Sequence, residues 1–280
     1  MTGPSTQTDA RRALLGALFD DAGLFPPASL AMPDAVAGHE RARTGPHAWM
    51  LGRFVCPAVK LASLIEHAAG SPVRVSVILD TPDAAMSAGD AADRSGGRIV
   101  IEQSEAKLPA VPPEDAVAGL LARAGEWPLY VEIPAAALAV IEIVNGQPGI
   151  GVKIRCGGDA MPSPESIAAT MVACRDARVP MKATAGLHHP YRTESQHGFL
   201  NICAAAVAAW TGADQVEVAS IVDERDTSAI TLTAASLTVR GRDFDAAACV
   251  GAREHLFASI GSCSFDEPVE DLIALGVLPA

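Results

Sequence analysis

Paired cysteines, long apolar runs and an excess of basic residues are all lacking from this sequence of 280 residues. No CxxC pair occurs, and the six cysteines are scattered at positions 56, 156, 174, 203, 249 and 263. Such scatter is typical of reduced, buried thiols and indicates a cytoplasmic protein.

The N-terminal segment and the charge balance exclude two classes of partner. The segment MTGPSTQTDARR has no apolar signal core, and no uninterrupted apolar run approaches 18 residues, so we expect no membrane span. Acidic residues outnumber basic ones 33 to 21, and no face rich in Lys and Arg is visible, which argues against nucleic acid as a partner. We expect residues 1–10 to form a flexible leader. The sequence leaves open whether the chain forms a homo-oligomer.

What is present is a regular alternation of strand and helix patterns. Such alternation favours a parallel sheet. Eight strand–helix units in a chain of this length predict one α/β domain over residues 11–280, a single (β/α)8 TIM-type barrel. A doubly wound open sheet is the rival. The predicted strands lie near residues 17, 54, 76, 101, 131, 153 and 183, and at 258–265.

The segment 199–257 has roughly twice the length that one helix and its turns need. Helical patterns at 199–210, 214–225 and 246–257 flank a Thr-rich stretch, residues 230–241. We predict a helical insertion before the last strand, close to the barrel mouth. The alternative is that the Thr-rich stretch is itself a barrel strand, which would shift the strand count by one.

Basic residues occupy one face of two neighbouring predicted strands. In GVKIRC the side chains of Lys153 and Arg155 point away from those of Val152 and Ile154, because a strand has a side-chain period of two. Lys182 begins the same pattern in MKAT. A lone buried charge is unfavourable, so these groups must pair or serve a ligand. Active sites of such barrels lie at the C-terminal ends of the strands.

This arrangement predicts lysine chemistry. A lysine desolvated beside another cation has a lowered pKa and can act as a Schiff-base nucleophile or a general base. We predict that Lys153 or Lys182 is catalytic and that Glu132 orients a lysine. His188 or His189 would shuttle protons as a general acid or base.

A second set of residues is predicted to bind an anionic substrate. Arg155 would clamp a carboxylate or phosphate, aided by backbone N–H groups of the following loop. The sequence thus predicts a small anionic metabolite as the ligand. The predicted substrate-binding residues are Arg74, Arg155, Gly157, Gly158, Thr184, Ser262 and Ser264.

Two other functions compete with this prediction. His188, His189 and His197 raise the question of a metal-dependent hydrolase or isomerase, with Glu132 as a further ligand. The spacing HHx7H is not a familiar zinc pattern, so we predict no metal and no cofactor. The other competitor is a non-catalytic, anion-binding barrel whose Lys, Glu and Arg form an internal network. Cys156 and Cys263 lie at strand ends, where packing is the simpler interpretation.

Several motifs resemble those of class I aldolases of the deoxyribose-phosphate-aldolase type. They are FDDAGLFPPASLAMPDAV, FVCPAVKLASLI, GVKIRCGG, MKATAGLHH and IGSCS. The resemblance implies a (β/α)8 barrel in which Lys153 is the Schiff-base lysine and Lys182 lowers its pKa. Ser262 and Ser264 would hold a phosphate, and Glu102 or Glu105 would be the acidic residue of the fourth strand. If the match is made from the C-terminus instead, Lys153 becomes the partner lysine.

Overall fold

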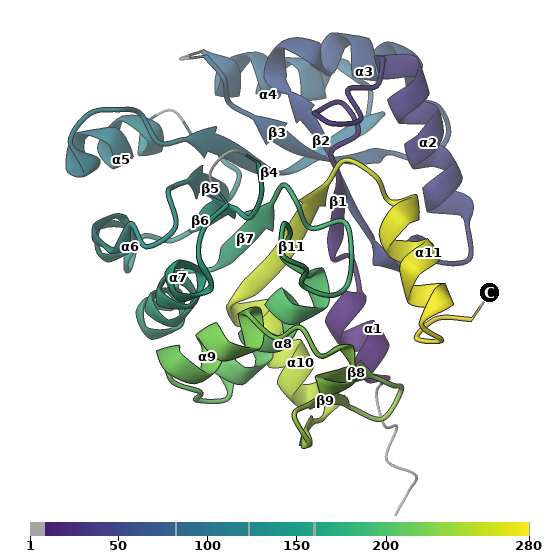
Figure 1. Ribbon diagram of the computed structural model, residues 1–280. Coiled ribbons are helices and arrows are strands. Elements are labelled where there is room, and N and C mark those ends of the chain that lie inside the picture. The colour runs from purple at the N-terminus through teal and green to yellow at the C-terminus, as the bar shows by residue number, and fades with distance from the viewer. Residues whose placement is uncertain (1–8, 82, 123, 159–160, 280) are drawn as a thin grey trace, which may run out of the picture.

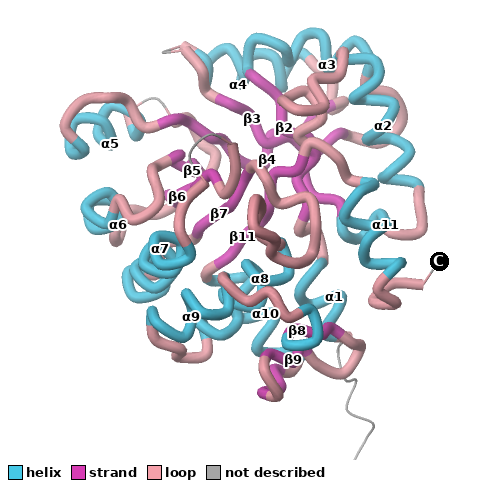
Figure 2. The backbone as a smooth tube through the Cα atoms, in the orientation of Figure 1, coloured by secondary structure: helices cyan, strands magenta, loops and turns pink. Residues whose placement is uncertain are grey.

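The chain folds into a closed barrel of eight parallel strands surrounded by helices (Figures 1 and 2). The computed structural model describes residues 9–81, 83–122, 124–158 and 161–279. Neighbouring strands around the barrel follow the order β1-β2-β3-β4-β5-β6-β7-β11, and β11 closes onto β1. The prediction of a single (β/α)8 barrel is therefore confirmed.

The strands lie close to their predicted positions. Their bounds are β1 Phe19–Asp21, β2 Leu51–Pro57, β3 Val73–Ile78, β4 Ile99–Lys107, β5 Leu129–Glu132, β6 Ile150–Arg155, β7 Met181–Thr184 and β11 Phe257–Ser262. The helices outside the predicted insertion are α1 Ala10–Leu15, α2 Met32–Thr44, α3 Leu61–His67, α4 Ala84–Arg94, α5 Pro113–Leu121, α6 Leu138–Val144, α7 Pro164–Ala177 and α11 Asp266–Ala274.

Helix α7 shows how local sequence sets an element's start and buried face. The Ser163 side chain accepts a hydrogen bond from the Ser166 amide, and Pro164 occupies the first turn, where its missing N–H is harmless. Ile167, Met171 and Cys174 recur at helical spacing and are fully buried against the barrel. The helix therefore begins and packs as its sequence predicts.

The predicted insertion is only partly helical. It comprises α8 Phe199–Trp210, α9 Gln215–Val222, β8 Ile230–Leu232, β9 Leu237–Val239, β10 Arg242–Phe244 and α10 Ala246–His255. The Thr-rich stretch belongs to a separate antiparallel sheet of β8, β9 and β10 and is not a barrel strand. This sheet lies beside α1 and α10 (Figure 1), where the Ala10 amide donates to the Ala234 carbonyl at 2.9 Å.

The predicted leader, residues 1–10, falls almost wholly outside the described residues. Ala10 is the first residue of α1 and is completely buried. Arg253 of α10 donates hydrogen bonds to the carbonyls of Leu14 and Gly16, at 3.1 and 3.2 Å, which holds α1 against α10. In the part of the chain that the structure describes, no helix has the length and apolarity needed to cross a bilayer.

A bulge in β4 determines which of its side chains face the barrel interior. Ile101 pairs with Val75, but the next residue of β3, Ser76, pairs with Gln103, so Glu102 is an extra residue. Ile101 packs in the apolar layer beneath the helices, whereas Gln103 contacts Ser76 inside the barrel. The extra residue therefore places both Glu102 and Gln103 on the inner side.

The close approach of β2 to β1 requires glycine at position 52. A Cβ there would collide with Oδ1 of Asp20 and approach the Phe19 carbonyl oxygen to 3.0 Å. We predict that Gly52→Ala lowers the free energy of unfolding by about 1–3 kcal/mol, because the crowded strands must shift. Denaturant unfolding measures the change. Gly38→Ala on α2 is the control, and it should be neutral or stabilising, because alanine favours helix. Equal effects of the two substitutions would contradict the prediction.

Candidate active site

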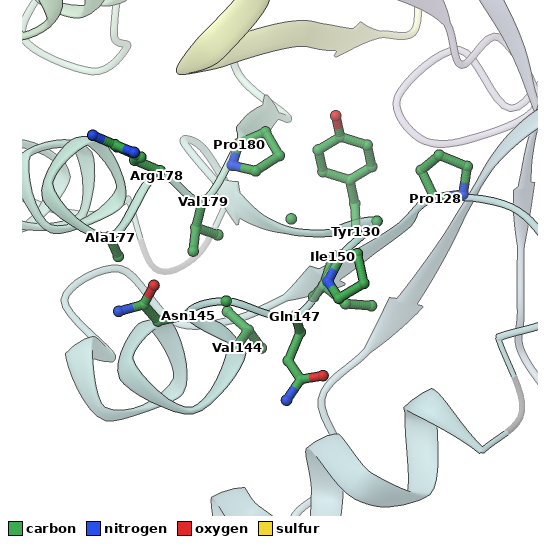
Figure 3. Close-up of a pocket in the computed structure, with 14 residues that line it drawn as sticks. Pro128, Tyr130, Val144, Asn145, Gln147, Ile150, Ala177, Arg178, Val179 and Pro180 are labelled. Atoms are coloured by element: carbon green, nitrogen blue, oxygen red, sulfur yellow. The ribbon is translucent and has the colours of Figure 1, made fainter.

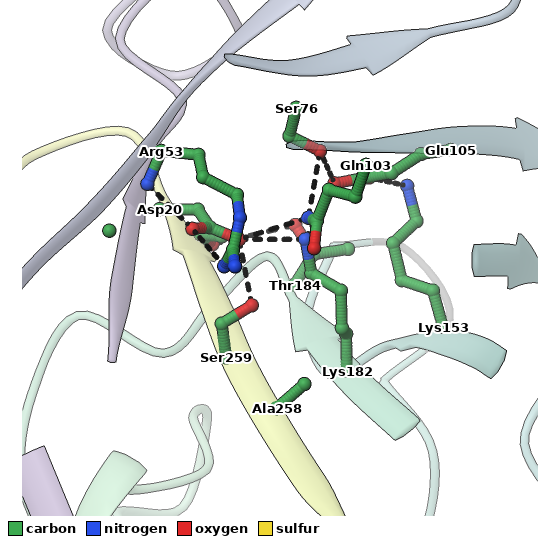
Figure 4. A network of polar contacts seen from close by, with 12 residues as sticks. Asp20, Arg53, Ser76, Gln103, Glu105, Lys153, Lys182, Thr184, Ala258 and Ser259 are labelled. Carbon is green, nitrogen blue, oxygen red and sulfur yellow. Dashed lines mark hydrogen bonds and ion pairs between the residues drawn. The ribbon is translucent and has the colours of Figure 1, made fainter. Parts of the chain in front are cut away.

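Two lysines lie side by side inside the barrel, joined by one carboxylate. Lys153 of β6 and Lys182 of β7 are in register. Glu105 of β4 accepts from Lys182 through Oε1 and from Lys153 through Oε2, each at 2.7 Å (Figure 4). Lys182 is 1% exposed and Lys153 is 7% exposed. The predicted convergence of the two lysines is therefore present, but a shared carboxylate lies between them.

These three residues belong to a longer series of alternating charges, which we call the core ion-pair chain. Glu132 Oε2 lies 2.9 Å from Lys153 Nζ, and Asp20 Oδ2 lies 2.7 Å from Lys182 Nζ. Arg53 lies 3.6 Å from Asp20 and 2.9 Å from Glu102, which lies 3.8 Å from Arg74. In order, the chain is Glu132, Lys153, Glu105, Lys182, Asp20, Arg53, Glu102 and Arg74.

Neutral polar side chains complete the hydrogen bonding of the buried carboxylates. The Ser259 hydroxyl donates to Asp20 Oδ2 at 2.7 Å. The Ser76 hydroxyl donates to Glu105 Oε1 at 2.6 Å and accepts from Gln103 Nε2 at 2.9 Å (Figure 4). A buried carboxylate needs such donors in addition to an ion pair, because each lost hydrogen bond to water must be replaced.

The two lysines have raised pKa values, in contrast to the lowered values predicted from sequence. Burial alone would lower the pKa of Lys182, but Asp20 and Glu105 outweigh burial and raise it above 10.5. For Lys153, burial is likewise outweighed by Glu105 and Glu132, so its pKa is also raised. The prediction was wrong because it counted the neighbouring cation but not the carboxylate between the two lysines.

Two carboxylates of the chain, Glu105 and Asp20, are held ionised by the same contacts. Burial would raise the pKa of Glu105, but Lys153 and Lys182 reverse this and place it well below 4.5. Burial would raise the pKa of Asp20 too, and Lys182 and Arg53 hold it below 3.8. At neutral pH the interior therefore contains compensated charges.

A cavity of about 580 Å³ opens at the C-terminal ends of the strands. Lys153 and Lys182 reach it from the barrel interior, and Glu132 borders it at the end of β5. Five further predicted residues line this mouth cavity. They are Arg155, Gly157, Gly158, Thr184 and His188. No described residue of 199–257 lines it. The prediction that the insertion lies close to the barrel mouth was therefore wrong.

Gly157 contributes by close packing between two loops of the mouth. A Cβ at Gly157 would lie 2.7 Å from the Cα of Gly186, and a Cβ at Gly186 would lie 2.8 Å from the Cα of Gly157. The loops after β6 and β7 therefore touch through their backbones. This contact holds Arg155 and Thr184, which are paired across β6 and β7, at one side of the cavity.

Four predicted residues lie away from the mouth cavity. Arg74 joins the far end of the core ion-pair chain and donates to the Gly52 carbonyl at 3.1 Å. The Ser262 hydroxyl donates to the Ser264 carbonyl at 2.6 Å, so it is used within its own turn. Ser264 in turn accepts from the Glu267 amide at 3.2 Å. His189 is half exposed and pairs with Asp271 at 2.8 Å.

The three histidines have separate partners and do not converge. His188 lines the mouth cavity, with its Nδ1 3.1 Å from Glu267. His197 is buried, contacting the Pro162 carbonyl through Nε2 and Arg192 through Nδ1. Burial lowers the pKa of His197, so it is neutral there. Within the described ranges, no group of three His, Cys, Asp or Glu side chains is arranged to hold a metal ion.

The cysteine side chains at the two predicted strand ends differ in access. Cys156 is completely buried, and burial raises its pKa to about 12, so its thiol is unreactive. Cys263 lines the mouth cavity, with its Sγ 3.9 Å from both ring nitrogens of His188. Burial raises the pKa of Cys263 as well.

A second cavity, of about 400 Å³, lies at the opposite ends of β5, β6 and β7 (Figure 3). The Tyr130 ring stands between Pro128 and Pro180, and its hydroxyl is directed away from Asn145 and Gln147. The Lys182 ammonium lies 5.3 Å from the centre of this ring. Tyr130 thus separates the second cavity from the two lysines, and none of the predicted site residues lines that cavity.

Sequence reasoning did not identify how several residues hold the lysines in place. Asp20 follows a short apolar segment at a strand end, which marks it as a candidate but does not reveal its partner. Ser76, Gln103 and Ser259 are ordinary polar residues within strands. The only signal for Ser76 is the alternation of VRVSVI, which places it opposite Val75 and Val77.

Comparisons with known proteins add no assignment. No protein-family model matches the chain, and neither curated proteins nor solved structures provide a match. The candidate site therefore stands on its own geometry.

We predict a distinctive pH dependence for the stability of a Glu105→Gln variant. The pKa values of Asp20 and Glu105 are lowered, so their stabilisation is present above about pH 4 and is lost as pH falls further. The lysine pKa values are raised, so their stabilisation is lost only as pH rises above 10.5. At pH 7 the variant should lose about 3–5 kcal/mol, because the lysines lose their shared partner.

Chemical denaturation at a series of pH values measures this difference. It should be largest near neutral pH and shrink below about pH 4, where Glu105 becomes protonated in the unfolded chain while the folded protein still holds it ionised. Glu270→Gln, which removes an exposed carboxylate of α11, is the control and should change stability by less than about 0.5 kcal/mol. A difference between wild type and Glu105→Gln that stays constant from pH 2 to 8 would refute the assignment.

Proposed function

We propose that the protein is a lysine-dependent lyase of the aldolase type, acting on a small anionic carbonyl compound in the mouth cavity. The observation that carries the proposal is the position of Lys153. Its Nζ lies at the floor of the cavity, 2.7 Å from Glu105 and 2.9 Å from Glu132. A buried amine at the end of a barrel strand, held by two carboxylates, is suited to covalent chemistry with a carbonyl group.

Lys153 is a better nucleophile candidate than Lys182. Lys182 is 1% exposed and holds Asp20 and Glu105 through two ion pairs of 2.7 Å. Lys153 is more accessible, and its second partner, Glu132, has 17% of its side chain exposed. A carbonyl compound entering from the mouth meets Lys153 first, and Lys182 acts through Glu105 as a positioning residue.

The carboxylates of Glu105 and Glu132 can stabilise a positively charged nitrogen at the end of the Lys153 side chain. Lys153 transfers a proton to Glu132, and the neutral amine attacks the carbonyl carbon to form a carbinolamine. Loss of water then gives an iminium ion, whose nitrogen carries the positive charge that the ammonium carried before. Glu105 and Glu132 are already placed to stabilise this charge, so little reorganisation is needed.

Bond cleavage next requires a base for the substrate hydroxyl. His188 lines the same cavity, and its Nδ1 lies 3.1 Å from the Glu267 carboxylate. His188 accepts the hydroxyl proton, the carbon–carbon bond breaks, and its electron pair moves to the iminium group to form an enamine. A carbonyl product leaves; protonation of the enamine and hydrolysis by water release the second product and restore the amine.

The resemblance to class I aldolases supports the same assignment. Lys153 lies on the sixth strand of the barrel and Lys182 on the seventh. The acidic residue that the resemblance implies on the fourth strand corresponds to Glu105, which contacts both lysines. The serines that the resemblance implies for phosphate do not line the cavity.

One observation favours the second candidate function, a non-catalytic barrel that binds an anion. The core ion-pair chain compensates the interior lysines without any ligand. In that case the two lysines are structural and the mouth only holds the anion. The experiment below separates this function from the lyase.

We predict that borohydride reduction in the presence of oxo acids or aldehydes labels Lys153 irreversibly. Reduction converts the iminium ion to a stable secondary amine, which peptide mass spectrometry locates. Lys153→Arg keeps the positive charge for Glu105 and Glu132 but cannot form the adduct, so labelling of the site should disappear while the fold is retained.

Surface lysines provide the internal control in the same digest. Lys60 and Lys107 are exposed, and labelling there should remain at background in both proteins. Labelling of Lys182 instead of Lys153 would reverse the assignment of the nucleophile. Absence of labelling at both lysines across the panel, with binding of the anions retained, would favour the non-catalytic barrel.

A further inference from the structure

One wall of the mouth cavity is apolar. It is formed by the loop after β1 and by the ends of β2 and β3, through Phe25, Pro26, Pro27, Val55 and Ile78. Val55 is 5% exposed and Ile78 is partly buried, so these side chains face the cavity without being fully covered. An apolar group of a ligand would displace water from this wall.

The opposite wall carries positive charge. Arg155 ends β6, two residues after Lys153 and on the same face of the strand. Two residues of a strand advance about 6.6 Å, so the long side chains of Lys153 and Arg155 can reach neighbouring atoms of one small ligand. Thr184 of β7 is paired with Arg155 of β6 and adds a hydroxyl to the same wall.

The charges around the cavity favour a monoanion over a phosphate dianion. Lys153 and Lys182 are already compensated by Asp20, Glu105 and Glu132. Glu267, in the first turn of α11, pairs with His188 at the rim and would repel a second negative charge. A planar carboxylate matches the paired donors of a guanidinium group such as that of Arg155.

We propose that the ligand of the mouth cavity is an oxo acid with one carboxylate and an apolar chain. The carboxylate lies at Arg155, the carbonyl carbon at Lys153, and the chain against Val55, Ile78 and Phe25. This inference rests on the proposed function for its carbonyl group. Its binding class, an apolar monocarboxylate, follows from the two walls of the cavity and is tested separately.

The first experiment compares three carbonyl compounds by borohydride trapping at Lys153. They are 4-methyl-2-oxopentanoate, the neutral ketone 4-methyl-2-pentanone, and glyceraldehyde 3-phosphate. We expect half-maximal labelling by the oxo acid at about 10- to 100-fold lower concentration than by the ketone, the factor that a charge-assisted pair provides. Arg155→Met should remove this advantage and leave labelling by the ketone within about threefold of wild type.

Two further variants control for general damage. Arg94→Met removes a largely exposed arginine of α4 and should leave all three labelling curves unchanged. Ile78→Ala shortens the apolar wall, so it should weaken labelling by 4-methyl-2-oxopentanoate by about fivefold or more, and labelling by pyruvate, which lacks the chain, by less.

Calorimetric titration with 4-methylpentanoate, which lacks the 2-oxo group that an amine could attack, separates this inference from the proposed function. If 4-methylpentanoate binds in an Arg155-dependent way but Lys153 is never labelled, the proposed lyase function is contradicted and the proposed ligand class, an apolar monocarboxylate, is supported. A different result is that glyceraldehyde 3-phosphate labels Lys153 at a concentration equal to or lower than that of the oxo acid, with no change in Arg155→Met. That result would support the lyase function and contradict the proposed ligand class. If 4-methylpentanoate does not bind and Lys153 is not labelled by any of the compounds, both proposals are overturned.

Discussion

The sharing of Glu105 between Lys153 and Lys182 is the interaction on which the rest of the barrel interior depends. The two carboxylate oxygens divide between the two ammonium groups at 2.7 Å each. The interior of a (β/α)8 barrel is ordinarily filled by layers of branched apolar side chains. Here charged and polar groups occupy that space, so every charge needs a partner and hydrogen bonds, or the fold loses stability. Asp20, Gln103 and Ser259 meet this requirement around the pair.

The same carboxylate reverses the simplest electrostatic expectation for the site. Two lysines on adjacent strands predict mutual repulsion and lowered pKa values. Because Glu105 lies between them, each lysine is closer to a negative charge than to the other lysine, and both pKa values rise. A site of this kind does not store a neutral amine at rest. It is built to stabilise a positively charged nitrogen, which is the form that both the ammonium ion and an iminium ion share.

Much of the fold and part of the site could be predicted from the sequence, because side-chain alternation determines which residues share a strand face. The faces of Lys153 with Arg155, and of Arg74 with Ser76, follow directly from a period of two. The bulge at Glu102 could not be predicted, since it depends on how β4 pairs with Ser76 and Val75. Nor does local sequence show that the Thr-rich stretch pairs with itself outside the barrel. His188 and His189 lie in the loop after β7, where alternation does not apply: His188 lines the cavity and pairs with Glu267 of α11, and His189 pairs with Asp271 of the same helix.

The core ion-pair chain also explains why the two lysines are not equivalent. Lys182 is enclosed by Asp20, Glu105 and the Tyr130 ring, so its contacts stabilise the fold and its amine is shielded. Lys153 ends the buried part of the chain, and its outer partner, Glu132, reaches the mouth cavity. A proton or a ligand can therefore exchange at Glu132 and Lys153 without disturbing the inner pairs. One oxygen of Glu105 is bound to Lys182, so the position of the other oxygen, beside Lys153, does not depend on Lys153 alone.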